Sequence, residues 1–453
     1  MPIPSRSPVA APATGAESRK AGSNRFGMGL LLGGVLASLV LILAVWGWIK
    51  MSTQPASPNI DCSLQGHPIP VGVLQTLSGP LASTSAFIIE ATKLAIDEIN
   101  EQGGVLGSRV EPMYVDGSPD ESALAEPINR LILENHVCAL FGCCSPAGRK
   151  NVIPILERYK HLLFYPVPCE GLEQSPNIVY VGAALNQQIL PGLQFATGTL
   201  RKRRLFLVGS DNVYSRTAHA ILADALAGSP DVRLVGKAFF PLGASEFKDA
   251  VANITASKAD AILNTISGDA NVGFFRALRA AGITPETIPT LSFDLEENEL
   301  RTLPVDHMRG DYAVCSYFPS VNRPENTAFV HKFHKHYGDH RVVTDAMESA
   351  YVAVQLWERA ATEAGDAQPA AVHAELRKLQ TNGPGGPVRI DPDNQYAWKV
   401  VRVAQMGERG QFKIVWSSEE PVSPQPFPPS RKREQWLRFL SGLQRDWGGR
   451  WGR

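Results

Sequence analysis

The chain has 453 residues, of which 44% are apolar and 19% are charged, so it is long enough to bury two globular cores. Basic and acidic side chains number 44 each, and this balance argues against a nucleic acid or another polyanion as the partner. The composition therefore predicts a globular protein of two domains.

The N-terminal residues differ from the rest in composition. Residues 1–25 are rich in proline, alanine, serine and glycine, and we expect a disordered cytoplasmic N-terminus there. Residues 26–49 carry no charge and, at a rise of about 1.5 Å per residue, are long enough to cross a bilayer. This pattern predicts a transmembrane anchor or signal, and the absence of a small-x-small cleavage motif directly after it favours an uncleaved single-pass anchor. The folded part of the chain then lies in the periplasm or outside the cell, after a Pro/Ser linker at 50–67.

From residue 69 onward, short apolar strands alternate with helices of 10 to 15 residues. We expect strands at 69–74, 110–115, 137–141, 161–165, 204–209, 232–240, 261–265, 290–293 and 311–317. We expect a first helix on the apolar spacing over 88–99, ended by the glycines at 103–104. Further helices are expected at 121–134, 147–158, 188–200, 216–227, 247–257, 272–281, 325–337 and 347–364, then a hairpin over 388–416. Such alternation predicts two α/β lobes, each a doubly wound parallel sheet.

Residues 140–176 hold the predicted ligand-binding loops. A strand leads into a Gly-Cys-Cys-Ser-Pro turn and a helix, and the next strand ends in a proline-rich loop. Ligands bind outside the carboxyl ends of strands in open α/β sheets, so loops 143–148 and 166–171 should line one pocket.

Seven stretches between about residues 68 and 428 carry a family resemblance. They are VGVLQTLSGPLA (71–82), AIDEINEQGGVLG (95–107), FGCCSPAGRK (141–150), LLFYPVPCEGLEQSPNIVYVGAALNQQ (162–188), NTISGDANVGFF (264–275), and IDPDNQYAWKVVRV (390–403) with IVWSSEEPVSP (414–424). In this order they resemble the urea and short-chain amide binding proteins of ABC transporters, a type I periplasmic-binding-protein family of the branched-chain amino-acid transporter type.

The resemblance implies a two-lobed type I periplasmic-binding-protein fold that closes on a ligand by hinge motion. Lobe 1 would comprise 68–188 plus 316–372, lobe 2 would comprise 189–315 plus 373–420, and a Pro-rich, then basic and aromatic tail would occupy 421–453. The protein would capture urea or a short-chain amide and present it to ABC permease subunits. It would need no cofactor and catalyse no reaction.

A urea-sized amide needs donors for its carbonyl and acceptors for its amide hydrogens in a small dry pocket. The predicted ligand-binding residues are Ser145, Tyr165, Cys169, Asp211, Tyr214, Asp269 and Glu297. Several have a structural alternative: Ser145 as a helix cap, Asp211 as a turn former, Tyr165 as a core aromatic and Glu297 as a solvated helix start.

The chain departs from the family pattern at this pocket. Cys144 and Pro146 stand in the Gly-Cys turn, and Cys169 and Asn212 stand where the family has aromatic residues. Smaller side chains widen the cavity, so the ligand is either larger than urea or no longer bound.

Other features support no second activity. The six cysteines allow a disulfide such as Cys144 to Cys169 in an oxidising compartment. The simpler interpretation is that the cysteines are small buried side chains with free thiols. The histidines of HKFHKHYGDH (331–340) favour a solvated cationic face over a metal site. Trp436, Leu440, Leu443 and Trp447 share one helical face, which allows either a membrane-surface helix or a disordered tail.

Two further functions remain open at this stage. A membrane-anchored sensor of the same fold would bind an amide or amino acid and signal to a partner. An amidase is the weaker alternative, because the sequence contains no Gly-x-Ser-x-Gly, Walker or His-Glu-x-x-His motif.

Overall fold

The computed structural model describes residues 62, 67–79, 81–117, 124–143, 145–295, 297, 308–407 and 410–452. The predicted cytoplasmic N-terminus and anchor, at 1–25 and 26–49, and most of the linker at 50–67 lie outside these residues. Among the described helices, none combines the length and the apolar character that a membrane span requires.

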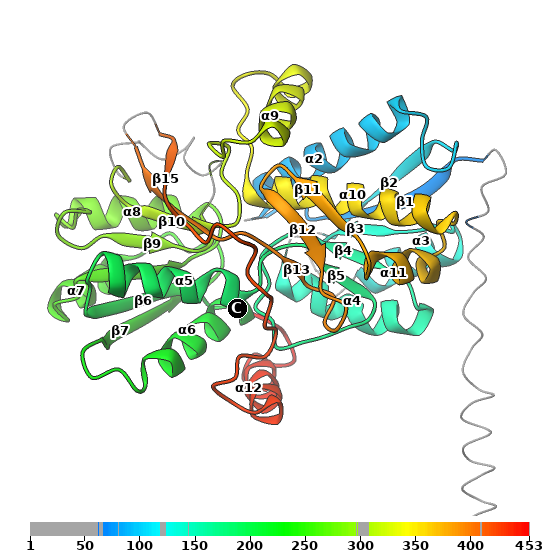
Figure 1. Cartoon of the computed structure of the whole chain (residues 1–453). Coiled ribbons are helices and arrows are strands. Elements are labelled where there is room, and N and C mark those ends of the chain that lie inside the picture. Colours follow the sequence, from blue (N-terminus) through cyan, green and yellow to red (C-terminus); the bar gives the residue numbers. More distant parts are fainter. Residues whose placement is uncertain are drawn as a thin grey trace, which may run out of the picture. The chain divides into compact units, whose positions relative to one another are not determined.

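The first lobe is built on a five-stranded parallel sheet in the order β2-β1-β3-β4-β5 (Figure 1). Its strands are β1 (Ile69–Gln75), β2 (Val110–Asp116), β3 (Leu140–Gly142), β4 (Leu163–Tyr165) and β5 (Ile178–Tyr180). Its helices are α2 (Ala82–Glu101), α3 (Ala125–Leu133), α4 (Pro146–Tyr159), α9 (Pro324–Tyr337), α10 (Asp345–Ala364) and α11 (Pro369–Leu376).

Aromatic side chains anchor the core of the first lobe. Phe141 of β3 stacks on Phe164 of β4 with ring centroids 5.2 Å apart, and meets Trp357 of α10 edge-on at 5.9 Å. Trp357 is fully buried, and α10 is held at its ends by the Thr344 cap and by Gly365 in the left-handed conformation. Replacing a fully buried tryptophan by alanine typically lowers the free energy of unfolding by about 3–5 kcal/mol.

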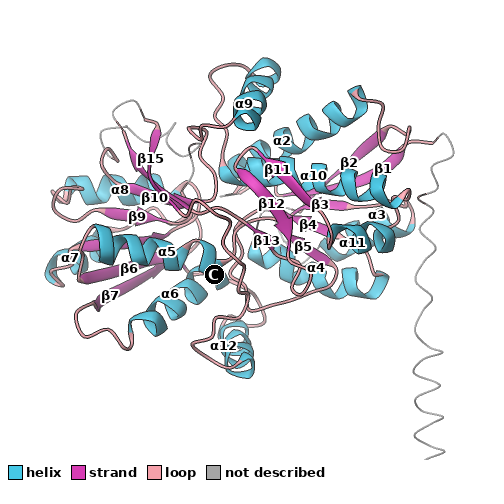
Figure 2. Cartoon of the chain, in the orientation of Figure 1, coloured by secondary structure: helices cyan, strands magenta, loops and turns pink. Residues whose placement is uncertain are grey.

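The second lobe is built on a seven-stranded sheet in the order β15-β14-β10-β9-β8-β6-β7, with helices on both sides (Figure 2). Its strands are β6 (Arg204–Ser210), β7 (Arg233–Phe240), β8 (Ala261–Thr265), β9 (Thr290–Ser292), β10 (Tyr312–Cys315), β14 (Arg402–Met406) and β15 (Phe412–Ser417). Its helical elements are η2 (Leu185–Gln187), α5 (Ile189–Gln194), η3 (Phe195–Thr199), α6 (Val213–Leu226), α7 (Lys248–Ala256), α8 (Ala270–Ala280) and α12 (Arg433–Asp446). The strands from β7 to β10 pair in parallel, and β14 and β15 join antiparallel.

The predicted hairpin over 388–416 is wrong. The strands β11 (Gln380–Gly383), β12 (Gly386–Ile390) and β13 (Ala397–Trp398) form a small separate sheet, whereas β14 and β15 complete the sheet of the second lobe. The predicted helix over 188–200 is confirmed as a continuous helical stretch, in which α5 is followed directly by the π-helical turn η3.

The first passage of the chain between the sheets is fixed by two glutamine side chains. Gln187 Nε2 donates to Ala397 O at 2.9 Å and to Val422 O at 2.7 Å. Gln188 Nε2 donates to Phe293 O at 2.6 Å and to Val314 O at 2.7 Å. This crossover is therefore bound to the later crossover near Ala397 and to the interior strands β9 and β10 of the second sheet.

A disulfide joins Cys62 to Cys138, with their Cα atoms 5.9 Å apart. It links the residues before β1 to the segment that leads into β3 of the first lobe. The predicted Cys144–Cys169 pairing is wrong, since Cys169 is a buried free thiol. Cys144 itself lies outside the described residues.

Candidate functional site

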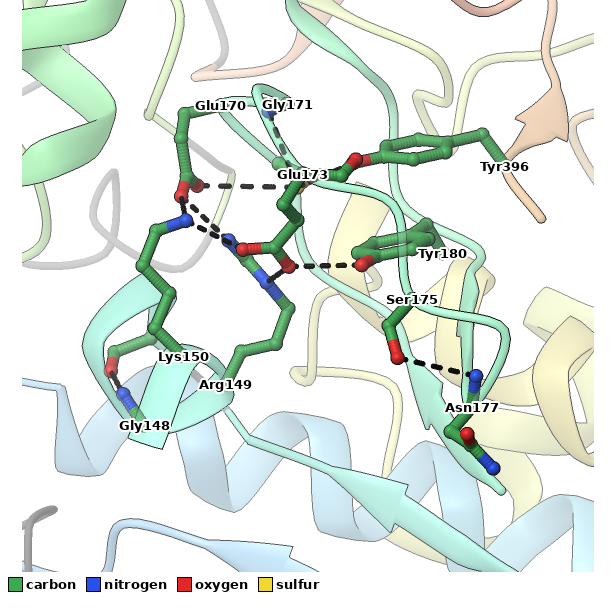
Figure 3. A network of polar contacts seen from close by, with 12 residues as sticks. Gly148, Arg149, Lys150, Glu170, Gly171, Glu173, Ser175, Asn177, Tyr180 and Tyr396 are labelled. Carbon is green, nitrogen blue, oxygen red and sulfur yellow. Dashed lines mark hydrogen bonds and ion pairs between the residues drawn. The ribbon is translucent and has the colours of Figure 1, made fainter. Parts of the chain in front are cut away.

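A network of four charged side chains is buried where α4 meets the loop after β4 (Figure 3). Arg149 Nη2 lies 2.6 Å from Glu170 Oε1, and Arg149 Nε lies 2.6 Å from Glu173 Oε1. Lys150 Nζ lies 3.0 Å from Glu170 Oε1 and 2.5 Å from Glu173 Oε2. Two cations thus face two carboxylates, and the network adds no net charge to the site.

The start of α4 explains why the two cations reach this loop. Ser145 is the N-cap, and its Oγ accepts a hydrogen bond from Gly148 N at 2.9 Å. Pro146 occupies the first helical position, which needs no N–H donor. The helix therefore begins immediately after β3 and places Arg149 and Lys150 in its first turns, beside the carboxyl end of the sheet.

Three tyrosines surround the network. The Arg149 guanidinium carbon lies 4.6 Å from the centre of the Tyr165 ring. Tyr180 and Tyr396 stack with centroids 3.9 Å apart, and the Tyr180 hydroxyl donates to Glu173 Oε1 at 2.9 Å. The Tyr396 hydroxyl donates to the main-chain oxygen of Glu173 at 3.1 Å. These contacts hold the carboxylate of Glu173 in one orientation.

Ionisation in the network follows from burial and neighbouring charge. Burial alone would raise the pKa of Glu173, but Arg149 and Lys150 lower that pKa to about 2. Burial would lower the pKa of Arg149, yet the surrounding acidic groups hold that pKa well above its ordinary value. Burial raises the pKa of the Cys169 thiol to about 12, so this cysteine is a neutral thiol at physiological pH and a poor nucleophile.

Three buried polar groups at this edge have no hydrogen-bond partner among the described residues: the side-chain amide of Gln75, Nη1 of Arg149 and the hydroxyl of Tyr165. Gln75 ends β1 and Tyr165 ends β4, and Gly142 of β3 lies on the strand between them. A buried polar group without a partner costs about 1–3 kcal/mol. Their grouping at the carboxyl ends of parallel strands is typical of a ligand site.

Of the predicted residues in the second lobe, Tyr214 lies close to this edge. Tyr214 is buried in the first turn of α6, and its hydroxyl donates to Gln188 Oε1 at 2.8 Å. After burial and Asp294, the acid Glu170 is among the groups that raise the pKa of Tyr214, so the phenol lies within electrostatic reach of the network. Asp211 follows β6 and accepts a hydrogen bond from Arg216 Nε at 2.7 Å.

The other predicted residues have different surroundings. Asp269 is exposed just before α8. Glu297 is buried rather than solvated, and with burial and Glu348 it raises the pKa of Tyr317. Cys169 lies at the network, with its Sγ 3.6 Å from the Tyr396 hydroxyl. Ser145, Tyr165, Cys169 and Tyr214 thus gather around one region.

Sequence reasoning missed Gln75, Arg149, Lys150, Glu170 and Glu173. The signal was present, because two bases and two acids lie in or beside the two loops assigned to the pocket. Charged side chains next to buried strands need partners, so oppositely charged sets in two converging loops predict a buried network.

The chain matches the family model described as periplasmic binding protein domain over residues 69–433. Among solved structures, it is similar to an ABC transporter solute-binding protein from R. palustris in complex with 4-hydroxybenzoate, at 23% identity and a TM-score of 0.71, covering 78% of this chain and 98% of that one. It is also similar to a branched-chain amino acid transporter substrate binding protein from Streptococcus pneumoniae in complex with isoleucine, at 19% identity and a TM-score of 0.69, covering 79% and 100%.

A curated relative matches only a short stretch. Limonene hydroxylase from Geobacillus stearothermophilus is 32% identical over 117 residues, which are 26% of this chain, and the match spans only about a fifth of that protein's length (21%).

The family match covers both sheets, and the predicted two-lobed type I fold with parallel sheets is confirmed. The prediction that the chain is not an enzyme is confirmed as well, because the family is non-enzymatic. The chain belongs to the family of periplasmic binding protein domains.

Proposed function

We propose that the chain is an extracytoplasmic solute-binding protein that captures urea or a short-chain amide between its two lobes and presents it to an ABC permease. The observation that carries this proposal is the group of buried, unpartnered polar atoms on Gln75, Arg149 and Tyr165 at the edge of the first sheet. In the same proposal, residues 26–49 tether the protein to the membrane.

The electrostatics of the site favour a neutral solute over a carboxylate. Arg149 and Lys150 are both paired with Glu170 and Glu173, so neither cation has an uncompensated charge to offer an anion. A carboxylate brought beside this network would meet two acids as well as two bases, and its desolvation would not be repaid.

The hydrogen-bonding groups suit an amide. An amide carbonyl accepts hydrogen bonds, which the Tyr165 hydroxyl and Arg149 Nη1 are able to donate, and an amide N–H needs an acceptor such as Gln75 Oε1. Ser145, Cys169, Asp211, Tyr214, Asp269 and Glu297 are proposed to complete the site from both lobes. The solved relatives named above were crystallised with carboxylates, so those compounds are the natural competitors to test.

The test is a calorimetric and thermal-shift titration of the full-length chain with urea, acetamide and formamide, against 4-hydroxybenzoate and isoleucine. A ligand present at 100 times its dissociation constant should stabilise the protein by about 2.7 kcal/mol. We expect a response to an amide, and a loss of roughly tenfold in its affinity in Tyr165→Phe, which removes one hydroxyl and keeps the ring. Tyr312→Phe, in which a half-buried hydroxyl on lobe 2 is removed, is the matched control.

A response to a carboxylate and not to any amide would reject the amide proposal and keep the solute-binding one. An amide affinity that is unchanged in Tyr165→Phe would place the ligand elsewhere.

A further inference from the structure

The C-terminal segment after β15 runs along the passage between the two sheets. Gln425 N donates to Asn186 Oδ1 at 2.8 Å, in the first crossover. Leu172 N, in the loop after β4, donates to Pro426 O at 2.7 Å. The segment therefore touches the loop that carries the acidic half of the charged network before it reaches α12.

The helix α12 then docks on the second lobe. Its apolar side chains Trp436 and Leu440, and Trp447 directly after its last residue, are buried in a core cluster of that lobe. Arg431 holds Asp224 of α6 with two hydrogen bonds of 2.6 Å each. The predicted apolar face exists, but it is covered by this chain, so the expectation of a membrane-surface helix or a disordered tail is wrong.

After α12 the chain turns back toward the start of α6. Gly448 and Gly449 adopt φ angles of 64° and 88°, a left-handed conformation that glycine takes without strain. Val213 N, at the first position of α6, then donates to Trp451 O at 3.1 Å, and Asn212 forms an antiparallel bridge with Gly452. The end of the segment is thus fixed to the second lobe at two places, α12 and the start of α6.

One side chain of this segment reaches the first lobe. Lys150 Nζ lies 5.0 Å from the centre of the Trp451 ring, within the range of a cation–π contact. Lys150 belongs to α4, which lies against α6 where the two lobes meet. Trp451 therefore joins an element held by lobe 2 to the charged network of lobe 1.

We propose that residues 430–452 form a strap that holds the two lobes together in the absence of ligand, with Trp451 as its contact to lobe 1. The match to the family ends at residue 433, so nearly all of the strap lies beyond the part of the chain that the family shares. The strap is independent of ligand identity, and it shifts the balance between open and closed lobes before any solute binds.

The test measures the distance between the lobes in the ligand-free, full-length chain by pulsed electron spin resonance. Labels are attached through unnatural ketone side chains at exposed positions of α3 and α7, Glu126 and Asn253, because the chain has six cysteines of its own. Trp451→Ala should raise the ratio of open to closed molecules by roughly threefold to thirtyfold, the range expected for one cation–π contact. Trp451→Phe, which keeps an aromatic face, should shift the ratio less.

The matched control is Trp398→Ala. Its indole also lies over a cation, Arg389 at 3.8 Å, but both partners of this contact belong to the small sheet β11-β12-β13, so the contact itself does not link the two lobes. A chain that ends at Asp446 should open at least as far as Trp451→Ala. Equal distances in wild type and Trp451→Ala, or an equal shift in Trp398→Ala, would overturn the proposal. Because no ligand is added, failure to find a solute leaves this result unaffected.

Discussion

At the scale of single residues, a charged side chain is buried in this protein where a partner of opposite charge lies beside it. Arg149 and Lys150 lie at the start of α4, and Glu170 and Glu173 lie in the loop after β4. They are buried because each has partners of opposite charge within 2.5–3.0 Å. Pairing between distant loops depends on the folded chain, so the sequence predicted the loops and missed the network.

Asp345 offers a test of how burial and neighbouring charges together set the pKa of a carboxyl group. Burial raises its pKa to about 6, with Lys399 opposing the shift and Glu348 reinforcing it, from an ordinary value of 3.8. The folded protein therefore binds this proton more tightly than the unfolded chain, and stability falls as the pH rises through the window from about 4 to about 6. Asp345→Asn should abolish that part of the fall, which is on the order of 3 kcal/mol.

The measurement is unfolding by guanidinium chloride at pH 4, 5, 6 and 7; urea is avoided because it is a proposed ligand. Asp393→Asn, at an exposed turn, is the control and should leave the pH profile unchanged. A parallel pH dependence in wild type and Asp345→Asn would contradict the assignment.

At the scale of elements, local patterns predicted most helices and strands. The prediction of a helix over 147–158 agrees with α4 to within one residue at each end, because Ser145 caps it and Pro146 opens it. The prediction of a hairpin over 388–416 was wrong, because alternating apolar residues identify a strand and say nothing of which sheet it joins. The apolar stripe of α12 was likewise visible, but its covering surface on lobe 2 comes from distant residues.

The N-cap of α4 has a measurable effect. Ser145→Ala should lower the free energy of unfolding by about 1 kcal/mol, because Gly148 N loses its acceptor in the cap. Ser145→Thr keeps the hydroxyl and should retain most of the stability in guanidinium unfolding. If Ser145→Ala weakens amide binding while Ser145→Thr does not, the same hydroxyl also serves the ligand; a stable Ser145→Ala protein would show that the cap contributes little.

At the scale of the whole molecule, the alternation of strands and helices predicted the fold class. What the pattern left out are the long-range ties, such as Cys62 to Cys138, which close a loop with a sequence separation of 76 residues. Spacing alone did not select this pair among six cysteines, since pairing depends on which side chains the fold brings within reach.

Loss of that disulfide should destabilise the protein by about 4 kcal/mol, the loop-closure entropy restored to the unfolded chain. Cys62→Ser and Cys138→Ser should give equal losses in guanidinium unfolding, and the double variant should lose no more than either alone. Wild type in reductant should fall to the same level. Additive losses would mean that each cysteine stabilises the fold separately.

The hydrogen bonds of Gln187 and Gln188 in the first crossover bear on how the two lobes move relative to each other. Gln187 binds the carbonyl of Ala397 in a later crossover, and Gln188 binds the carbonyls of Phe293 and Val314 in the second sheet, so we expect the two linked crossovers to bend together. We therefore expect the two lobes to swing mainly about one axis. If so, a partner that touches one point on each lobe would detect a bound ligand from the distance between those two points.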